Sequence, residues 1–117
     1  MNPKVNVKEI QLTLITFKDD NVYNVYCPSL NLCGSGYNET EAKDSFNIVF
    51  NEYITYTTEN NTLIDDLKSC GWKISENSKK LLPPAIVESL LLDKDLGAIL
   101  NNYDFEKRSI KATIPIA

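Results

Sequence analysis

The side chains that most often do chemistry in proteins are sparse in this chain of 117 residues. It has no histidine, so it lacks the usual general base near neutral pH, the commonest metal ligand and any Ser–His or Cys–His nucleophilic pair. Its three cysteines, Cys27, Cys33 and Cys70, lack the C-x-x-C spacing of a zinc site, and their odd number argues against a disulfide framework. We therefore expect no catalytic residue, no metal site and no cofactor, and interpret the cysteines as core residues.

Acidic residues are concentrated in one segment of the chain. Residues 38–66 hold a single base, Lys43, and have a net charge of −6, whereas the whole chain has −4. The acids in this segment are Glu39, Glu41, Asp44, Glu52, Glu59, Asp65 and Asp66. An acidic surface repels phosphate and attracts basic proteins, so a basic protein is favoured over nucleic acid as a partner. A solvated helix face is the alternative explanation.

The length and composition are typical of one soluble domain. Apolar residues make up 43% of the chain and charged residues 24%. No run approaches the roughly 20 apolar residues of a membrane span, and residues 1–8 lack the apolar core of a signal peptide. We expect a cytoplasmic protein.

Hydrophobic periodicity predicts a hairpin and a third strand in the first third of the chain. Residues 7–17 alternate apolar and polar side chains, residues 18–21 are turn formers, and residues 22–27 are rich in β-branched and aromatic side chains. Pro28 ends the second strand, and residues 32–37 form a third strand. The glycines Gly34 and Gly36 in that strand indicate a bulge or a close backbone approach.

A long amphipathic helix follows this third strand. Asn38 is a favoured N-cap, and Glu41 is placed to reach back to the amide of the cap. Residues of one buried stripe then recur at spacings of three and four over about five turns, at Ala42, Phe46, Val49, Phe50, Tyr53 and Thr57. We expect this helix to pack across the sheet.

The rest of the chain predicts shorter elements. Residues 63–70 favour a helix, and residues 71–74 a fourth strand in which Trp72 anchors the core. Further helices are expected over 85–92 and 95–100, and a final strand over 108–116.

The predicted fold class is α+β: a small antiparallel sheet in the order β-β-β-α-β with one long helix across one face, short C-terminal helices and a final strand. Residues 1–76 form the main domain, and residues 77–117 a C-terminal extension packed on it. The final strand must pair with an existing edge, in its own chain or in a second copy, and we expect a homodimer.

Residues Val22 to Ile54 resemble the N-terminal domain of the HicB antitoxin family. The similar parts are VYNVYCPSLNLC (Val22 to Cys33), Gly36, NETEA (Asn38 to Ala42) and the helix end Glu52-Tyr53-Ile54. The family often has Pro-Gly where this chain has Asn31-Leu32. The likeness is close over about thirty residues and extends in element order over residues 5–75.

The resemblance implies a partial ribonuclease-H-like fold and a partner, HicA, which is a small basic ribonuclease that cuts messenger RNA. The antitoxin would neutralise HicA by covering its active site. The residues expected to bind the partner are Tyr26, Pro28, Leu30 and Asn31 in the loop, and Glu39, Asp44 and Glu52 on the helix. HicB proteins usually also bind DNA, but residues 84–101 carry Glu88, Asp93 and Asp95 against Lys94 alone, so direct DNA binding is not expected.

Three alternatives to these expectations stay open. Leu30 could fill the core beneath its loop instead of contacting a partner. The sheet face around Tyr23, Tyr26, Tyr37 and Cys33 could form a small-ligand pocket. The chain could also be a structural domain without a toxin partner.

Overall fold

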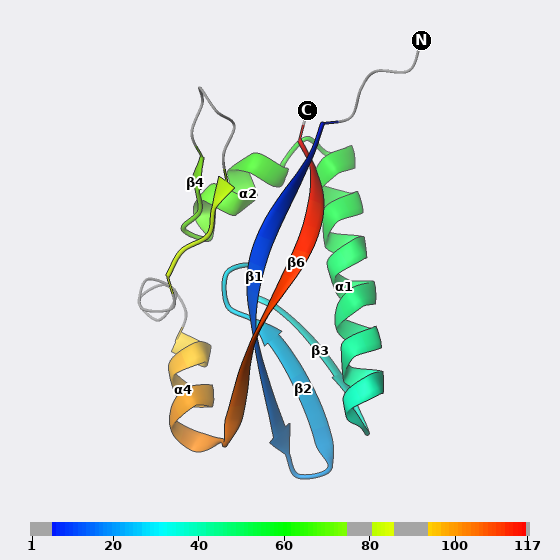
Figure 1. Ribbon diagram of the computed structural model, residues 1–117, viewed down its shortest axis with the longest axis vertical. Helices are drawn as coiled ribbons and strands as arrows, with labels where there is room; N and C mark the ends of the chain where they lie inside the picture. The colour runs from blue at the N-terminus through cyan, green and yellow to red at the C-terminus, as the bar shows by residue number, and fades with distance from the viewer. Residues whose placement is uncertain (1–5, 75–80, 86–93, 117) are drawn as a thin grey trace.

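The computed structural model describes residues 6–74, 81–85 and 94–116, and has the α+β fold that the periodicity predicts. Its main sheet is antiparallel, with the strand order β3-β2-β1-β6 (Figure 1). The strands are β1 (Asn6–Asp19), β2 (Val22–Cys27), β3 (Leu32–Gly36) and β6 (Phe105–Ile116). The predicted hairpin, third strand and final strand are thus confirmed.

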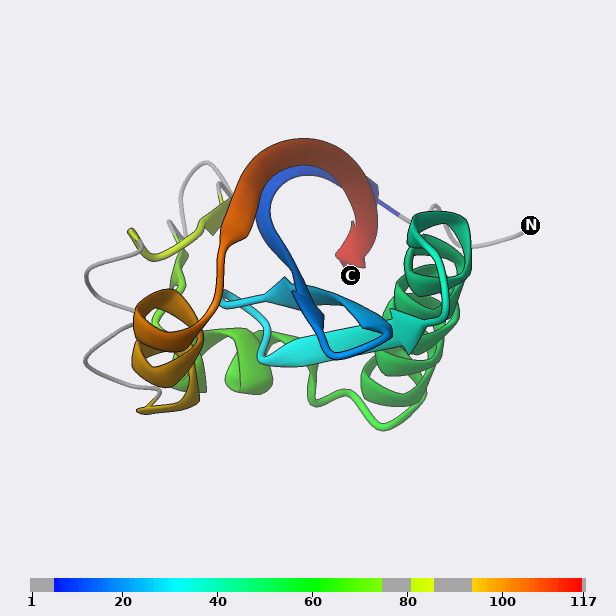
Figure 2. The same ribbon diagram turned by 90° about the horizontal axis from the view of Figure 1, so that it is seen from below.

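The final strand pairs with β1 of its own chain. The β1–β6 register runs from Asn6 opposite Ile116 to Phe17 opposite Phe105, whereas β2 pairs only with the last part of β1, from Ile15 to Asp19. Seen from below, the two long strands curl together away from β2 and β3 (Figure 2). The expectation that this strand pairs with an existing edge is confirmed, and the edge belongs to the same chain.

The long helix α1 (Glu39–Glu59) begins with a side-chain cap. Asn38 has an extended backbone, and its Oδ1 accepts a hydrogen bond of 2.8 Å from the amide of Glu41. The predicted return bond was wrong in one detail, because the Glu41 carboxylate accepts from the amide of Tyr37, at 2.8 Å, and not from that of Asn38. The bond therefore fixes the residue before the cap, which is where β3 turns into the helix.

Two glycines let α1 lie directly on β3. A Cβ atom on Gly34 would stand 2.2 Å from the backbone nitrogen of Phe46, and one on Gly36 would stand 2.4 Å from Cβ of Glu41. Real Cβ atoms do not approach other atoms so closely, so any side chain here would push the helix away from the strand. The predicted close backbone approach is confirmed.

The sheet has a core on each face: a larger one that includes residues of α1 and α2, and a smaller one that includes α4. Helices α1 and α4 lie on opposite sides of the strands (Figures 1 and 2). The alternation of Ile10, Leu12 and Leu14 on β1 points these side chains to the α1 side. The opposite side holds a smaller cluster, in which Ile15 and Tyr26 pack against Leu96. The helices are α2 (Leu63–Ser69) and α4 (Lys94–Asn102), which confirms the predicted helix over 95–100.

The strand predicted over 71–74 forms only at Lys73–Ile74 (β4), and it lies outside the main sheet. It pairs with β5 (Leu81–Leu82) in a separate two-stranded sheet. The fourth strand of the main sheet is β6, because β1 is 14 residues long and its first part extends beyond β2. Trp72 does anchor the core, since it is 3% exposed and its Nε1 donates to the carbonyl of Ser29 at 2.7 Å.

Two further expectations have a partial outcome. The helix expected over 85–92 falls almost entirely on residues outside the described part of the chain. Among the cysteines, Cys27 is buried and Cys70 half-buried, but Cys33 is exposed, so the core interpretation was wrong for Cys33. Cys33 lies opposite Tyr26 on the edge strand β3, on the face that α1 does not cover.

None of the helices in the described ranges is long and apolar enough to cross a membrane.

Candidate functional site

The loop between β2 and β3 places most of its predicted site residues inside the protein. Tyr26 and Leu30 are 5% and 3% exposed, and Pro28 is also buried. The hydroxyl of Tyr26 donates to Oδ1 of Asn31 at 3.1 Å, and Asn31 is exposed in the left-handed region, at φ 55°. Leu30 therefore fills the core beneath the loop in this structure, and Asn31 alone of the four is open to a partner.

The predicted acids of α1 are all exposed, but they do not share one surface. A helix has 3.6 residues per turn, so positions four apart lie on the same face. Asp44 and Glu52 face away from the sheet, opposite the buried side chains of Ala42 and Phe46. Glu39 lies at the start of the helix, on the side of the sheet, and lines a pocket. The structure thus leaves Asp44 and Glu52 on the outside of α1 and places Glu39 apart from them, at the pocket.

Two large apolar residues lie beside these acids on the outside of α1. Ile48 is 59% exposed and Tyr56 68% exposed. They continue the four-residue step from Asp44 through Glu52, and Glu59 follows one turn later. We call this surface the α1 outer face: Asp44, Ile48, Glu52, Tyr56 and Glu59.

The acids of the α1 outer face form no ion pair within the described part of the chain. In the described ranges the ion pairs are Arg108–Glu106 and Lys111–Glu9, and neither involves this helix. The last turn of α1 has no basic residue. Sequence reasoning missed Ile48 and Tyr56, because it counted only the buried apolar stripe. The signal was present for Ile48, which falls off that stripe at the spacing of the acids, whereas Tyr56 lies three residues after Tyr53 and seven after Val49, at the edge of the stripe.

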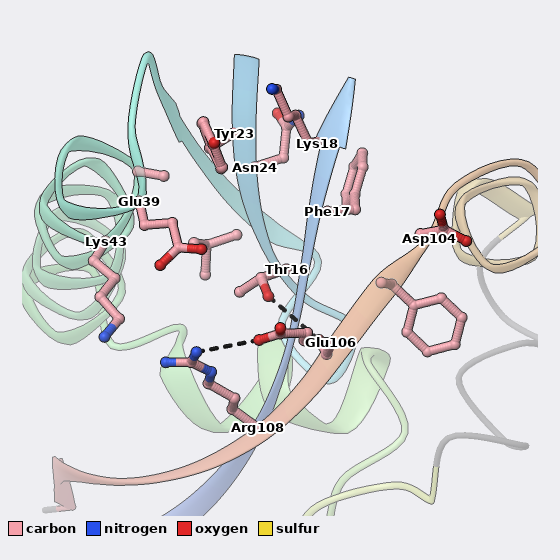
Figure 3. A pocket seen from close by; sticks show the side chains of 13 residues that line it. Thr16, Phe17, Lys18, Tyr23, Asn24, Glu39, Lys43, Asp104, Glu106 and Arg108 are labelled. Carbon is pink, nitrogen blue, oxygen red and sulfur yellow. Dashed lines mark hydrogen bonds and ion pairs between the residues drawn. The ribbon is translucent and has the colours of Figure 1, made fainter. Parts of the chain in front are cut away.

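A pocket of about 230 Å³ lies on the α1 side of the sheet, between the first turns of α1 and strands β1, β2 and β6 (Figure 3). Its lining residues are Thr16, Phe17, Lys18, Tyr23, Asn24, Val25, Glu39, Ala42, Lys43, Asp104, Phe105, Glu106 and Arg108.

Of the residues expected to form a ligand pocket, only Tyr23 lines this one. Tyr26 packs with Ile15 on the opposite side of the sheet, because neighbouring odd and even positions of a strand point to opposite faces. Cys33 faces the same way as Tyr26, and Tyr37 is 79% exposed. The aromatic group expected from the sequence is thus divided between the two faces.

The pocket brings charged and aromatic side chains together. Arg108 Nη2 and Glu106 Oε2 are 3.1 Å apart, and the ammonium of Lys18 lies 5.3 Å from the centre of the Tyr23 ring. Lys43 and Glu39 reach toward the same space from α1 (Figure 3). These residues come from distant parts of the chain, which is why no local motif predicts them.

Cys27, Cys70 and Tyr53 have raised pKa values and lie outside the pocket. Burial raises the pKa of the Cys27 thiol and, with the nearby Asp66 carboxylate, that of Cys70, so both stay protonated and are poor nucleophiles near neutral pH. Burial and a hydrogen bond to Asp66 raise the pKa of Tyr53, whose hydroxyl ties α1 to α2. Within the described residues, no group of three Cys, Asp or Glu side chains could hold a metal ion.

Comparisons of the chain with models of protein families, with curated proteins and with solved structures find no match.

Proposed function

We propose that this chain is a HicB-like antitoxin, or a protein-binding module derived from one, which neutralises a small basic HicA-type ribonuclease by covering its active site. The observation that carries the proposal is the α1 outer face, where exposed Ile48 and Tyr56 lie among acids. The resemblance of residues 22–54 to the HicB family supports the same role. The role is binding and not catalysis.

The composition of the α1 outer face suits a basic protein partner. Asp44, Glu52 and Glu59 would attract it over a distance and orient it, since electrostatic complementarity acts mainly on the association rate. Ile48 and Tyr56 would then supply the apolar contact, because binding energy is concentrated in a few buried side chains, tyrosine among them. A nucleic acid would be repelled by the same charges.

The buried loop residues have an indirect part in this proposal. Tyr26, Pro28 and Leu30 hold the loop in place, and Asn31 is the member that a partner can reach. A loop that is already fixed loses little conformational entropy on binding. The partner surface is therefore centred on α1, with Asn31 as a separate polar contact.

The expected homodimer is also part of the proposal. Strand β6 uses one edge to pair with β1 and, among the described residues, has no strand on its other edge. Unpaired edges favour strand addition by a second copy. Light scattering should give the mass of a dimer at high micromolar concentration. A monomer throughout that range would remove the dimer from the proposal without affecting the role of α1.

The test begins with the neighbouring reading frame, which should encode a short basic protein with one histidine. Its purified product should cleave RNA, and this chain should inhibit the cleavage. Ile48→Arg and Glu52→Lys should each weaken inhibition about tenfold or more, the effect of removing a hot-spot contact. Asp65→Lys is the control, because it reverses a charge of the same acidic segment that is on α2 and not on α1.

Two outcomes would contradict the proposal. If Ile48→Arg inhibits as well as the unchanged chain, α1 does not form the docking surface. If no neighbouring basic frame exists and no basic ribonuclease is bound, the chain is not a working antitoxin, and the interpretation as a structural domain takes its place.

A further inference from the structure

The pocket beside the start of α1 has an apolar floor. Val25 and Ala42 are buried, at 3% and 1% exposure, and the ring of Tyr23 is half-buried beside them. A volume of about 230 Å³ holds about eight water molecules at ~30 Å³ each. A space of this kind suits a small metabolite.

The mouth of the pocket carries charges of both signs. Lys43 and Arg108 reach toward it from α1 and from β6, with Glu39 and Glu106 beside them (Figure 3). Arg108 uses one nitrogen for Glu106 and keeps further N–H donors. Among the described residues, Lys43 and Glu39 form no ion pair. An ammonium and a carboxylate are therefore both available at one end of an apolar pocket.

The balance of charge selects the kind of ligand. The cations lining the pocket are Lys18, Lys43 and Arg108, and the anions are Glu39, Asp104 and Glu106, so their formal charges cancel. A simple anion or cation would meet attraction and repulsion together, whereas a molecule with one charge of each sign can satisfy both.

From this arrangement we propose that the pocket binds a free α-amino acid with an apolar side chain. The carboxylate of the ligand lies toward Lys43 and Arg108, and its ammonium toward Glu39. Its side chain rests on Val25, Ala42 and the Tyr23 ring. This activity goes beyond the docking of a protein on the α1 outer face and uses different residues.

Three probes with the same phenyl group test the proposal: L-phenylalanine, 3-phenylpropionate, which lacks the ammonium, and phenethylamine, which lacks the carboxylate. Binding is followed by amide shifts in NMR spectra of the full chain. Phenylalanine should bind with a dissociation constant on the order of 1 mM, as expected for a ligand of this size. The other two probes should bind about fivefold more weakly, which is the effect of losing one partly exposed ion pair.

Matched variants locate the site. Lys43→Gln should weaken the binding of phenylalanine about fivefold and leave the affinity for phenethylamine unchanged. Glu39→Gln should leave the affinity for 3-phenylpropionate unchanged. Arg108→Gln should act like Lys43→Gln, while Lys107→Gln is the control, since its side chain is on the other face of β6. Equal binding of the three probes would overturn the proposal. So would the absence of amide shifts around the pocket at about 10 mM phenylalanine, well above the expected dissociation constant.

Discussion

At the scale of single residues, Leu30 determines what the loop after β2 can do. Its side chain is 3% exposed and belongs to the main core, while the neighbouring Ser29 carbonyl accepts a hydrogen bond from Trp72. These contacts connect the loop to a residue 43 positions later in the chain. The loop is therefore built as part of the core, and under the proposed function Leu30 would act on partner binding only by keeping Asn31 in place.

Leu30→Ala should reduce the free energy of unfolding by about 2–5 kcal/mol, because it leaves a cavity in a packed core. Leu82→Ala is the matched control at a position that is 46% exposed, and should cost less than about 1 kcal/mol. Urea denaturation measures both. A small loss for Leu30→Ala, together with lost partner binding, would instead identify Leu30 as a contact residue.

The buried phenol and thiols predict a pH dependence on the alkaline side. The pKa values of Cys27, Cys70 and Tyr53 are raised in the folded protein from ordinary values of 9.0 for the thiols and 10.0 for the phenol. The folded state thus holds these protons more tightly, so their stabilising contribution is full below the unfolded pKa values and is lost as pH rises above them. With no histidine, no side chain has its ordinary pKa between pH 5 and 8.

The melting temperature should therefore change little from pH 6 to 8 and fall above about pH 9. Tyr53→Phe should make the decline above pH 10 shallower, since it removes the phenol that donates to Asp66. Tyr56→Phe, at an exposed position of the same helix, is the control and should leave the slope unchanged. The same slope in Tyr53→Phe and the unchanged chain would contradict this account.

At the scale of elements, the contact between β3 and α1 positions both candidate sites. Gly34 and Gly36 bring the strand against the helix backbone, and the bonds of Asn38 and Glu41 fix where the helix begins. With α1 held in this position, the side chain of Ile48 is exposed to solvent and Glu39 lines the pocket.

Gly34→Ala should reduce the free energy of unfolding by about 3 kcal/mol, because backbone atoms of α1 would have to move. This is the upper end of the range for overpacked sites. Ser35→Ala, one position along and on the other face of β3, should cost less than about 0.5 kcal/mol. Chemical denaturation compares the two. Equal stability of the two variants would mean that α1 does not lie on β3 as closely as described.

These elements also mark how far the sequence predicts the fold. Strands β1 to β3, the Asn38 cap and the close approach at Gly34 and Gly36 each follow from residues that are near one another in the sequence. The sequence predicts each of them to within a few residues. Which strand joins which edge has no local signal, so Lys73–Ile74 was expected in the main sheet, although it pairs with Leu81–Leu82. Pairing depends on strand length and on contacts between distant residues, and periodicity carries neither.

At the scale of the whole molecule, the two candidate sites differ in how far the sequence predicts them. Asp44 and Glu52 were predicted because they share one helix, and a helix sets its faces by a fixed period. The pocket joins residues of β1, β2, α1 and β6, from Thr16 to Arg108, and these meet only through the fold. The two sites also lie on different sides of α1, so a variant can change one and leave the other intact.

In the proposed function, the α1 outer face attracts a basic protein through exposed charge. The most direct measurement is the affinity of this chain for the basic product of the neighbouring reading frame as the salt concentration is raised. Exposed charges are screened over about 8–10 Å at physiological salt, so affinity should fall and the association rate should fall most strongly. Asp44→Asn should flatten that dependence, while Asp65→Asn on α2 should not. Affinity that stays the same from low to high salt would contradict the claim and would mean that these acids only keep the helix solvated.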